Sequence, residues 1–255
     1  MRRIMGAILG AGRRSDGRRR AGGTLADVAE LLPIFPLGLV AFPGMAVPLH
    51  VFEERYRDLV RHLLDVPDPA ERLFGIVAIR EGWEVAGRGG SSSAQSLYRT
   101  GCVVQLTTHE EYADGRFDIA AVGRHRMRVV ETDGGATYLR ARVEPLYAGA
   151  ELSPAAAVEA ARTLSVFERY RAAVSALRGD EVMSGGLPRD PELLSYVLAA
   201  TCSFTLPERQ QLLESPTAPE RLAHLRRLLH RELGAIRAVP SLPATEVARS
   251  GWSPN

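Results

Sequence analysis

The sequence contains no lysine, so all 32 of its basic residues are arginine. This absence excludes chemistry that needs a lysine amine, including Walker A phosphate loops, serine–lysine dyads and Schiff-base enzymes. Cysteine is scarce as well. Cys102 and Cys202 lie far apart in apolar surroundings, which indicates buried thiols and not a disulfide framework or a metal knuckle.

Long apolar runs are also missing, because no stretch approaches the roughly 18 to 20 residues that a membrane-spanning helix requires. The basic start, residues 1–14, holds a short apolar segment that glycine interrupts, and no small-residue cleavage site follows it. We therefore expect a cytoplasmic protein.

Positive charge is concentrated at the beginning of the chain. Residues 1–24 hold seven arginines and one acid, a charge of +6; because the whole chain carries +2, the rest carries −4. A mildly acidic body argues against a nucleic-acid footprint on the folded surface. We expect residues 1–30 to form a disordered arginine-rich leader.

The segment from residue 31 to residue 147 has the pattern of a β-rich subdomain, in which proline and glycine separate short apolar runs. A single amphipathic helix is expected within it, with Phe52, Tyr56, Leu59, Val60 and Leu63 on one face. The Gly-Ser-rich stretch 87–96 is typical of a mobile loop. The expected strands are Leu32–Leu37, Val47–Phe52, Leu73–Ile79, Cys102–Leu106, Phe117–Val122, Met127–Val130 and Leu139–Val143.

After Tyr147 the apolar period becomes helical, which predicts a second subdomain over residues 153–236 and a flexible tail over 237–255. Four capping patterns predict four helix starts. Two apolar stripes predict buried helix faces: Phe167, Tyr170, Val174 and Leu177, and then Leu222, Leu225, Leu229 and Leu233. The capping patterns begin at Ser153, Asp190, Thr205 and Thr217.

Motifs for catalysis fail one by one. Gly10-Ala-Gly12 lacks the third glycine of a dinucleotide fingerprint, and His109-Glu110-Glu111 lacks the second histidine of a zinc-protease helix. No nucleophile elbow occurs, and Cys202 has only helix-borne histidines as possible partners. We predict no catalytic residue, no cofactor and no metal.

Two surfaces leave alternatives open. The arginines from Arg124 to Arg142 either bind phosphate or an acidic partner or lie on a solvated strand face with salt bridges. Arg126 and Arg128 share one face of a strand, as do Arg140 and Arg142, which favours the solvated face. The apolar turn Val40–Leu49 either forms a sticky surface suited to polypeptide binding or folds beneath its own barrel.

The motifs together resemble the amino-terminal domain of Lon proteases, over most of the chain. The helical end, Leu206 to Glu214 followed by Arg221-Leu222, is similar to that family as well. The first part carries Leu32-Pro33, Pro36-Leu37, Phe42-Pro43-Gly44, Pro48-Leu49, Phe52-Glu53, Arg55-Tyr56, Gly101-Cys102 and Gly123 with Arg126-Met127-Arg128-Val129.

The resemblance implies an α+β fold, a PUA-like pseudo-β-barrel with one covering helix followed by a carboxyl-terminal α-helical bundle. It also implies capture of unfolded or tagged polypeptides, or of a protease or chaperone partner, without ATPase or peptidase modules. An RNA-associated PUA-like protein is the alternative, and weak homo-oligomerisation is a further expectation. We expect the polypeptide contacts at Phe42, Met45, Phe52 and Tyr56.

Overall fold

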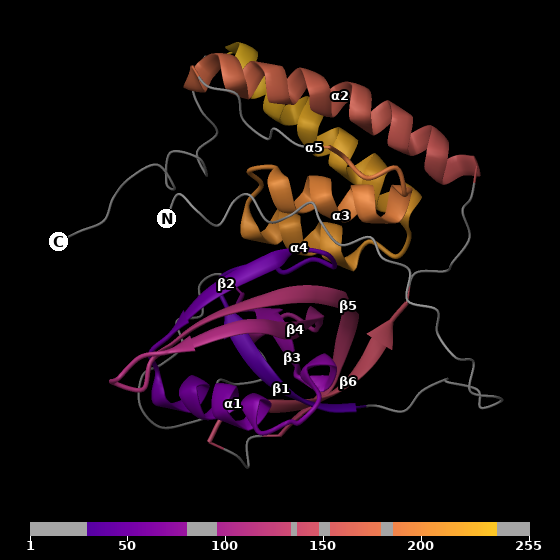
Figure 1. Ribbon diagram of the computed structural model, residues 1–255. Coiled ribbons are helices and arrows are strands. Elements are labelled where there is room, and N and C mark those ends of the chain that lie inside the picture. Colours follow the sequence, from indigo (N-terminus) through magenta and orange to yellow (C-terminus); the bar gives the residue numbers. More distant parts are fainter. Residues whose placement is uncertain (1–29, 81–95, 134–136, 148–153, 180–185, 239–255) are drawn as a thin grey trace.

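The computed structural model describes residues 30–80, 96–133, 137–147, 154–179 and 186–238. Residues 1–29 of the expected leader, all of the expected Gly-Ser loop except Ser96, and residues 239–255 of the expected tail lie outside these ranges, whereas Glu30 belongs to a strand and Arg237 and Ala238 to a helix. A β-rich part occupies residues 30–147 and a helical part occupies residues 154–238, stacked one above the other (Figure 1).

The sheet of the β-rich part closes on itself, because its longest strand pairs with three others. β5 pairs antiparallel with β4 along most of its length, with β2 through its first half and with β6 through its second half. β1 joins β6 to β3, and its pairing with β3 is the one parallel pairing among the strands described. The strands are β1 (Glu30–Leu37), β2 (Ala46–Val51), β3 (Leu73–Ala78), β4 (Thr100–Glu111), β5 (Phe117–Asp133) and β6 (Arg140–Leu146).

The two strands expected at Phe117–Val122 and Met127–Val130 are one continuous strand, so that prediction was wrong. In the ladder with β4, Gly123 pairs with Val104 and His125 with Val103. Arg124 is therefore an extra residue, which β5 accommodates as a bulge instead of ending.

The predicted covering helix is present as α1 (Glu54–Leu64), after which a short 3-10 turn, η1 (Pro69–Glu71), leads into β3. Its apolar face buries Tyr56, Leu59, Val60 and Leu63 against the sheet. The prediction placed Phe52 on this face as well, but the helix begins two residues later and Phe52 is exposed.

The helical part contains α2 (Pro154–Arg178), α3 (Pro191–Thr201), α4 (Leu206–Glu214) and α5 (Ala218–Ala238), each starting where the capping patterns predict. The carboxylate of Asp190 accepts a hydrogen bond from the backbone of α3, and Glu208 accepts one from the backbone N–H of Thr205. No helix within the described ranges is both long and apolar enough to cross a membrane.

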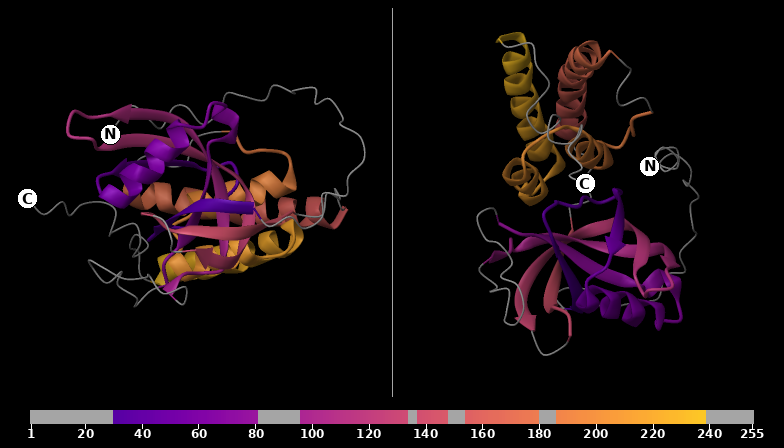
Figure 2. Two further views of the ribbon diagram at one scale, coloured as in Figure 1. Left: turned by 90° about the horizontal axis from the view of Figure 1, so that it is seen from below. Right: turned by 90° about the vertical axis from the view of Figure 1, so that its left-hand side faces the viewer.

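The long helices α2 and α5 lie along each other, whereas the shorter α3 and α4 lie between them and the sheet (Figures 1 and 2). Both predicted apolar stripes face the interior, although Leu177 is only partly buried. The core of the helical part extends into the β-rich part, because Val40, Phe42 and Ala78 belong to the same buried cluster.

Candidate functional site

The four side chains predicted to contact a polypeptide lie in two different environments. Phe42 is completely buried and Tyr56 is 8% exposed, whereas Phe52 is 61% exposed and Met45 is partly buried. A partner can bind only side chains that it can reach. In this structure the side chains of Phe42 and Tyr56 are out of a partner's reach, whereas the side chain of Phe52 is accessible.

Phe42 belongs to the junction between the two parts of the molecule. Its ring lies 6.4 Å from the ring of Tyr196 on α3, and the guanidinium of Arg209 on α4 lies 5.5 Å from its centroid. The chain turns at Gly44, whose φ of 78° suits glycine. The apolar turn is thus covered by the helices of its own chain.

Gly123 holds this turn from the side of the sheet. Its N–H donates to the carbonyl oxygen of Met45 and its carbonyl oxygen accepts from the N–H of Gly44, both at 2.9 Å. A Cβ atom at this position would lie 2.1 Å from the carbonyl oxygen of Phe42. The Phe42-Pro43-Gly44 turn and Gly123 of β5, which are separate in the sequence, therefore contact each other in the fold.

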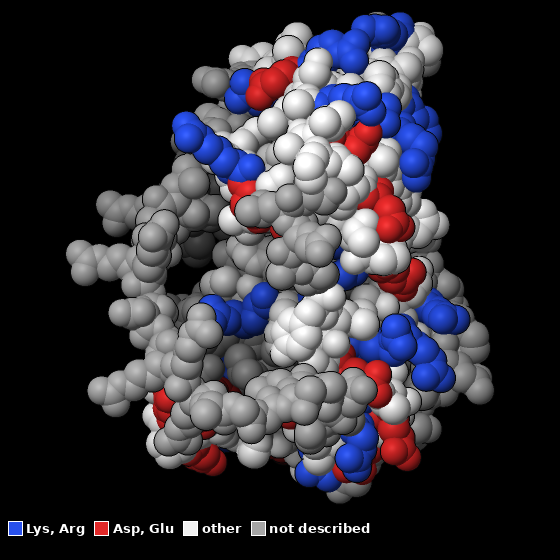
Figure 3. Space-filling view, turned by 90° about the vertical axis from the view of Figure 1, so that its right-hand side faces the viewer, with Lys and Arg blue, Asp and Glu red and all other residues white. Residues whose placement is uncertain are grey.

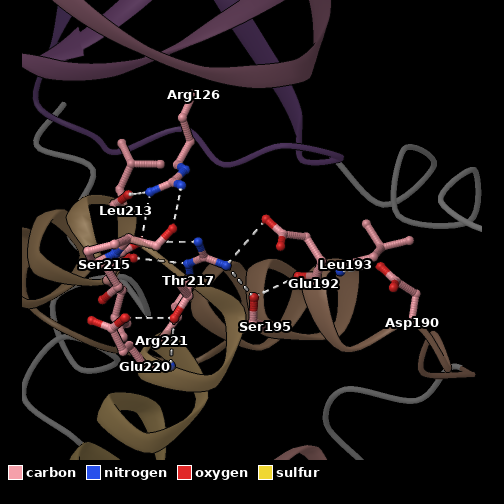
Figure 4. A network of polar contacts seen from close by, with 12 residues as sticks. Arg126, Asp190, Glu192, Leu193, Ser195, Leu213, Ser215, Thr217, Glu220 and Arg221 are labelled. Carbon is pink, nitrogen blue, oxygen red and sulfur yellow. Dashed lines mark hydrogen bonds and ion pairs between the residues drawn. The ribbon is translucent and has the colours of Figure 1, made fainter. Parts of the chain in front are cut away.

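Arg126 connects β5 to the end of α4. The residue is 4% exposed, and its guanidinium donates to the carbonyl oxygens of Leu213, Ser215 and Pro216 at 3.0, 2.7 and 2.9 Å (Figure 4). The carbonyl groups at a helix carboxyl end lack partners within the helix and carry partial negative charge. The expectation of a solvated face at Arg126 was wrong, because α4 supplies acceptors there.

Arg221, on α5, binds the same helix end from the opposite side and is completely buried. It donates to the carbonyl oxygens of Leu212 and Ser215, both at 3.2 Å, and to the hydroxyl of Ser195 at 2.7 Å (Figure 4). Its guanidinium also lies 4.0 Å from the centroid of the Tyr196 ring. Burial and the charge of Arg126 lower its pKa, while Tyr196 and Glu192 act in the opposite direction.

Sequence reasoning noted Arg221 only as part of a family pattern and missed its role. One signal was available: Arg221 stands four residues before Leu225, in phase with the leucines that form the buried face of α5. An arginine in phase with a buried stripe needs several acceptors, because an unpaired buried charge is costly.

Phe52 lies in a surface group that we call the aromatic cluster: His50, Phe52, Tyr112, Arg116 and Asp118. The imidazole of His50 is central, with the rings of Phe52 and Tyr112 each 6.2 Å away. Nδ1 of His50 lies 2.6 Å from a carboxylate oxygen of Asp118, and the Tyr112 hydroxyl donates to the other oxygen at 2.7 Å. The guanidinium of Arg116 lies 5.8 Å from the centroid of the Tyr112 ring.

The hydrogen bonds of the aromatic cluster keep its carboxylate ionised. The hydrogen bond from Tyr112, followed by that from His50, lowers the pKa of Asp118, and the same carboxylate raises the pKa of Tyr112. The rings of His50 and Tyr112 are therefore held by hydrogen bonds to Asp118, while the neighbouring Phe52 side chain stays exposed. Such a surface can bind apolar and aromatic side chains without reacting with them.

The two thiols lie in positions unsuited to nucleophilic chemistry. Burial raises the pKa of Cys102 to about 12 and also raises that of Cys202. A thiol becomes reactive when its pKa falls, because the thiolate is the nucleophile. Within the part of the chain that the structure describes, no group of three or more histidine, cysteine, aspartate or glutamate side chains could hold a metal ion.

Comparison with solved structures identifies the fold. A Lon N-terminal domain protein from Xanthomonas campestris superposes with a TM-score of 0.52 at 26% sequence identity, over 77% of this chain and 96% of that one. The N-terminal domain of a Lon protease from the Mycobacterium avium complex superposes with a TM-score of 0.59 at 16% identity, over 79% and 98%. The six-stranded mixed sheet with its helices is thus the fold of Lon N-terminal domains.

Comparison of sequences leads to the same group. A Lon protease from Dictyoglomus thermophilum is 24% identical over 208 residues, and Lon protease 1 from Thermus thermophilus is 29% identical over 210 residues. These alignments cover 81% and 79% of this chain, which spans about a quarter of the length of these curated relatives. The model of the ATP-dependent protease La (LON) substrate-binding domain matches residues 31–231, so the chain belongs to that family.

Proposed function

We propose that this protein binds polypeptides without catalysing a reaction, as the substrate-binding part of a Lon-type system. The observation that carries the proposal is the family match over residues 31–231, which spans both the β-rich and the helical part. The proposal includes the finer fold assignment: a PUA-like pseudo-barrel over residues 31–147 and a helical bundle over residues 153–236. The closure of the sheet through β5 and β6 supports the barrel.

The aromatic cluster is the contact surface that we propose. Phe52 is one of the large apolar side chains that the structure exposes, and its ring lies beside the imidazole of His50. Asp118 holds His50 and Tyr112 in place through hydrogen bonds. Aromatic side chains are enriched among the residues that dominate binding energies. Met45 ranks below Phe52 as a candidate contact, because its side chain is partly buried and packs against the cores of both parts of the molecule.

The RNA alternative lacks its main support. Arg126, central to the expected basic face, is buried against carbonyl oxygens. On the face shown in Figure 3, arginine and carboxylate side chains are interspersed over the helical and the β-rich parts. We therefore propose binding of unfolded or tagged polypeptides, or of a protease or chaperone partner, with weak self-association as a secondary property.

Binding of an unfolded polypeptide tests the proposal. The probe is a fluorophore-labelled, permanently unfolded chain of near-zero net charge, and the readout is fluorescence anisotropy. We expect Phe52→Ser to weaken binding by about five- to thirtyfold, the effect of losing a side chain worth roughly 1–2 kcal/mol. Tyr147→Ser is the matched control, because Tyr147 is 66% exposed and lies outside the aromatic cluster.

Three results are informative. A loss with Phe52→Ser and none with Tyr147→Ser supports both the function and the site. Equal losses with both variants would move the contact surface away from the aromatic cluster. No binding by the unaltered protein at any accessible concentration would refute polypeptide capture.

A further inference from the structure

The distal part of β4 projects beyond the strand that covers its beginning. β3 pairs with β4 only as far as Gln105, and the N–H of Leu106 donates to the carbonyl oxygen of Arg72. From Thr108 to Glu111, β4 pairs only with β5 among the described residues, whereas Thr107 is an extra residue at a register shift of that ladder; all five residues from Thr107 to Glu111 are exposed. With β2 on the far side of β5, these segments form a three-stranded extension with two outer edges.

The ladder shows which main-chain groups of β4 face outward. The N–H of Tyr112 donates to the carbonyl oxygen of Arg116 at 2.9 Å, so the main-chain groups of Tyr112 point toward β5. In an antiparallel pair, bonded and non-bonded positions alternate. Glu110 therefore also points toward β5, whereas the N–H and C=O groups of His109 and Glu111 point away from it, toward solvent.

The opposite edge of the extension, along β2, lacks this capacity. Asp118 of β5 pairs with Glu110 of β4, so the main-chain groups of Asp118 point toward β4. Ala120 lies two positions further along β5, and its main-chain groups therefore point toward β4 as well. Pro48 is the partner of Ala120 in β2, and its nitrogen therefore points to the outer side. Proline has no N–H to donate. The β2 edge is therefore interrupted by Pro48. The β4 edge offers the N–H and C=O groups of both His109 and Glu111.

The charged side chains near the β4 edge favour an incoming strand with positively charged side chains. The nearby carboxylates of Asp114 and Asp118 are engaged with Arg116 and His50. Glu110 and Glu111 are exposed and form no ion pair with any described residue. An approaching strand with basic side chains would supply the missing counter-charges, whereas an acidic strand would be repelled.

We propose that the outer edge of β4, from Thr107 to Glu111, receives an extended arginine- or lysine-bearing segment of a bound polypeptide as an additional strand. The proposal rests on the proposed function and names the substrate class. Strand addition draws affinity from main-chain hydrogen bonds, which every polypeptide can form. This suits a protein that must bind many unfolded sequences.

The first experiment removes one outward donor. The probe is a labelled twelve-residue peptide of alternating threonine and lysine, measured by fluorescence anisotropy. His109→Pro deletes an N–H that faces away from β5, so the ladder of the hairpin keeps its bonds. We expect about tenfold weaker binding to His109→Pro and unchanged binding to His109→Ala, which keeps the N–H but loses the same side chain.

The second experiment leaves the protein unaltered. The same peptide with an N-methyl group on every residue keeps its charge but has no main-chain N–H to donate from either edge, and we expect it to bind about tenfold more weakly. A threonine–glutamate peptide should also bind more weakly. Equal binding of the methylated peptide, or of the His109→Pro variant at equal thermal stability, would overturn strand addition; equal binding of the acidic peptide would overturn the charge preference.

Failure of this inference is distinguishable from failure of the proposed function. If the unfolded polypeptide binds and responds to Phe52→Ser but is indifferent to His109→Pro, capture stands and strand addition does not. If the unfolded polypeptide does not bind at all, the proposed function itself is lost.

Discussion

The two ends of the β-rich part differ in how far their apolar side chains are buried and their charged groups are paired. At the junction with the helices, the Phe42 turn is buried and the guanidinium groups of Arg126 and Arg221 are matched with carbonyl oxygens. At the three-stranded extension, the Phe52 ring is exposed and the carboxylates of Glu110 and Glu111 have no described ion partner. The junction is therefore built for cohesion, and the extension is available for binding.

The largest expected effect comes from breaking the junction at Arg221. Arg221→Ala removes three hydrogen bonds from a buried charged donor, to the carbonyl oxygens of Leu212 and Ser215 and to the Ser195 hydroxyl, and we expect a loss of about 3–5 kcal/mol in the free energy of unfolding. Chemical denaturation measures it. Arg227→Ala, an exposed arginine of the same helix, should change stability by less than about 0.5 kcal/mol; a similar loss there would disprove the assigned role of Arg221.

Arg126→Ala should cost about 2–4 kcal/mol, because it removes three hydrogen bonds from a charged donor. Both arginines donate to the carbonyl oxygen of Ser215. The double variant should therefore deviate from additivity by at least about 0.5 kcal/mol. Arg128→Ala, exposed on the same strand, is the control, and strict additivity of the junction pair would show that the two arginines act separately.

Gly123→Ala tests the contact between the turn and β5. A Cβ atom 2.1 Å from a backbone oxygen forces the strands apart, and we expect a loss of about 1–3 kcal/mol. Gly38→Ala is matched to it, because a Cβ atom there has nothing within 4 Å. Thermal melting of both variants should show a lower Tm for the first alone.

The smallest effect is expected at the extension, where Tyr112→Phe removes the main hydrogen bond to Asp118. Because that bond lowers the pKa of Asp118, the pKa should rise toward its ordinary value in the variant. A carboxylate with a lowered folded-state pKa stabilises the fold above its unfolded pKa, and this contribution is lost as pH falls through the folded pKa. A carbon-13 titration of the carboxyl group measures the shift, and Tyr147→Phe should leave it unchanged.

Local patterns predicted much of the architecture, because short-range chemistry determines it. The strand expected at Leu139–Val143 overlaps β6, in which Ala141 and Val143 are buried, and the capping patterns located four helix starts. The bulge at Arg124 was missed because an irregular residue within a strand resembles a strand end when no partner strand is in view.

The site was only partly predictable, because exposure depends on what packs against a residue from elsewhere in the chain. The sequence analysis singled out both Phe42 and Phe52 as contacts, yet α3 and α4 cover the first and leave the second accessible. Tyr112 and Asp118 were not considered, since their connection to His50 depends on the register between β2 and β5.

The arginines of the junction recognise α4 through main-chain oxygens, and this affects how the molecule can change over time. The side chains of Leu213, Ser215 and Pro216 play no part in the bonds that Arg126 makes. These hydrogen bonds therefore constrain where α4 ends and not which side chains stand there, whereas the two guanidinium groups have no substitute. Leu212 and Leu213 are held by their burial in the core, so natural variation across this contact is expected mainly at Ser215 and Pro216, with the two donors remaining fixed.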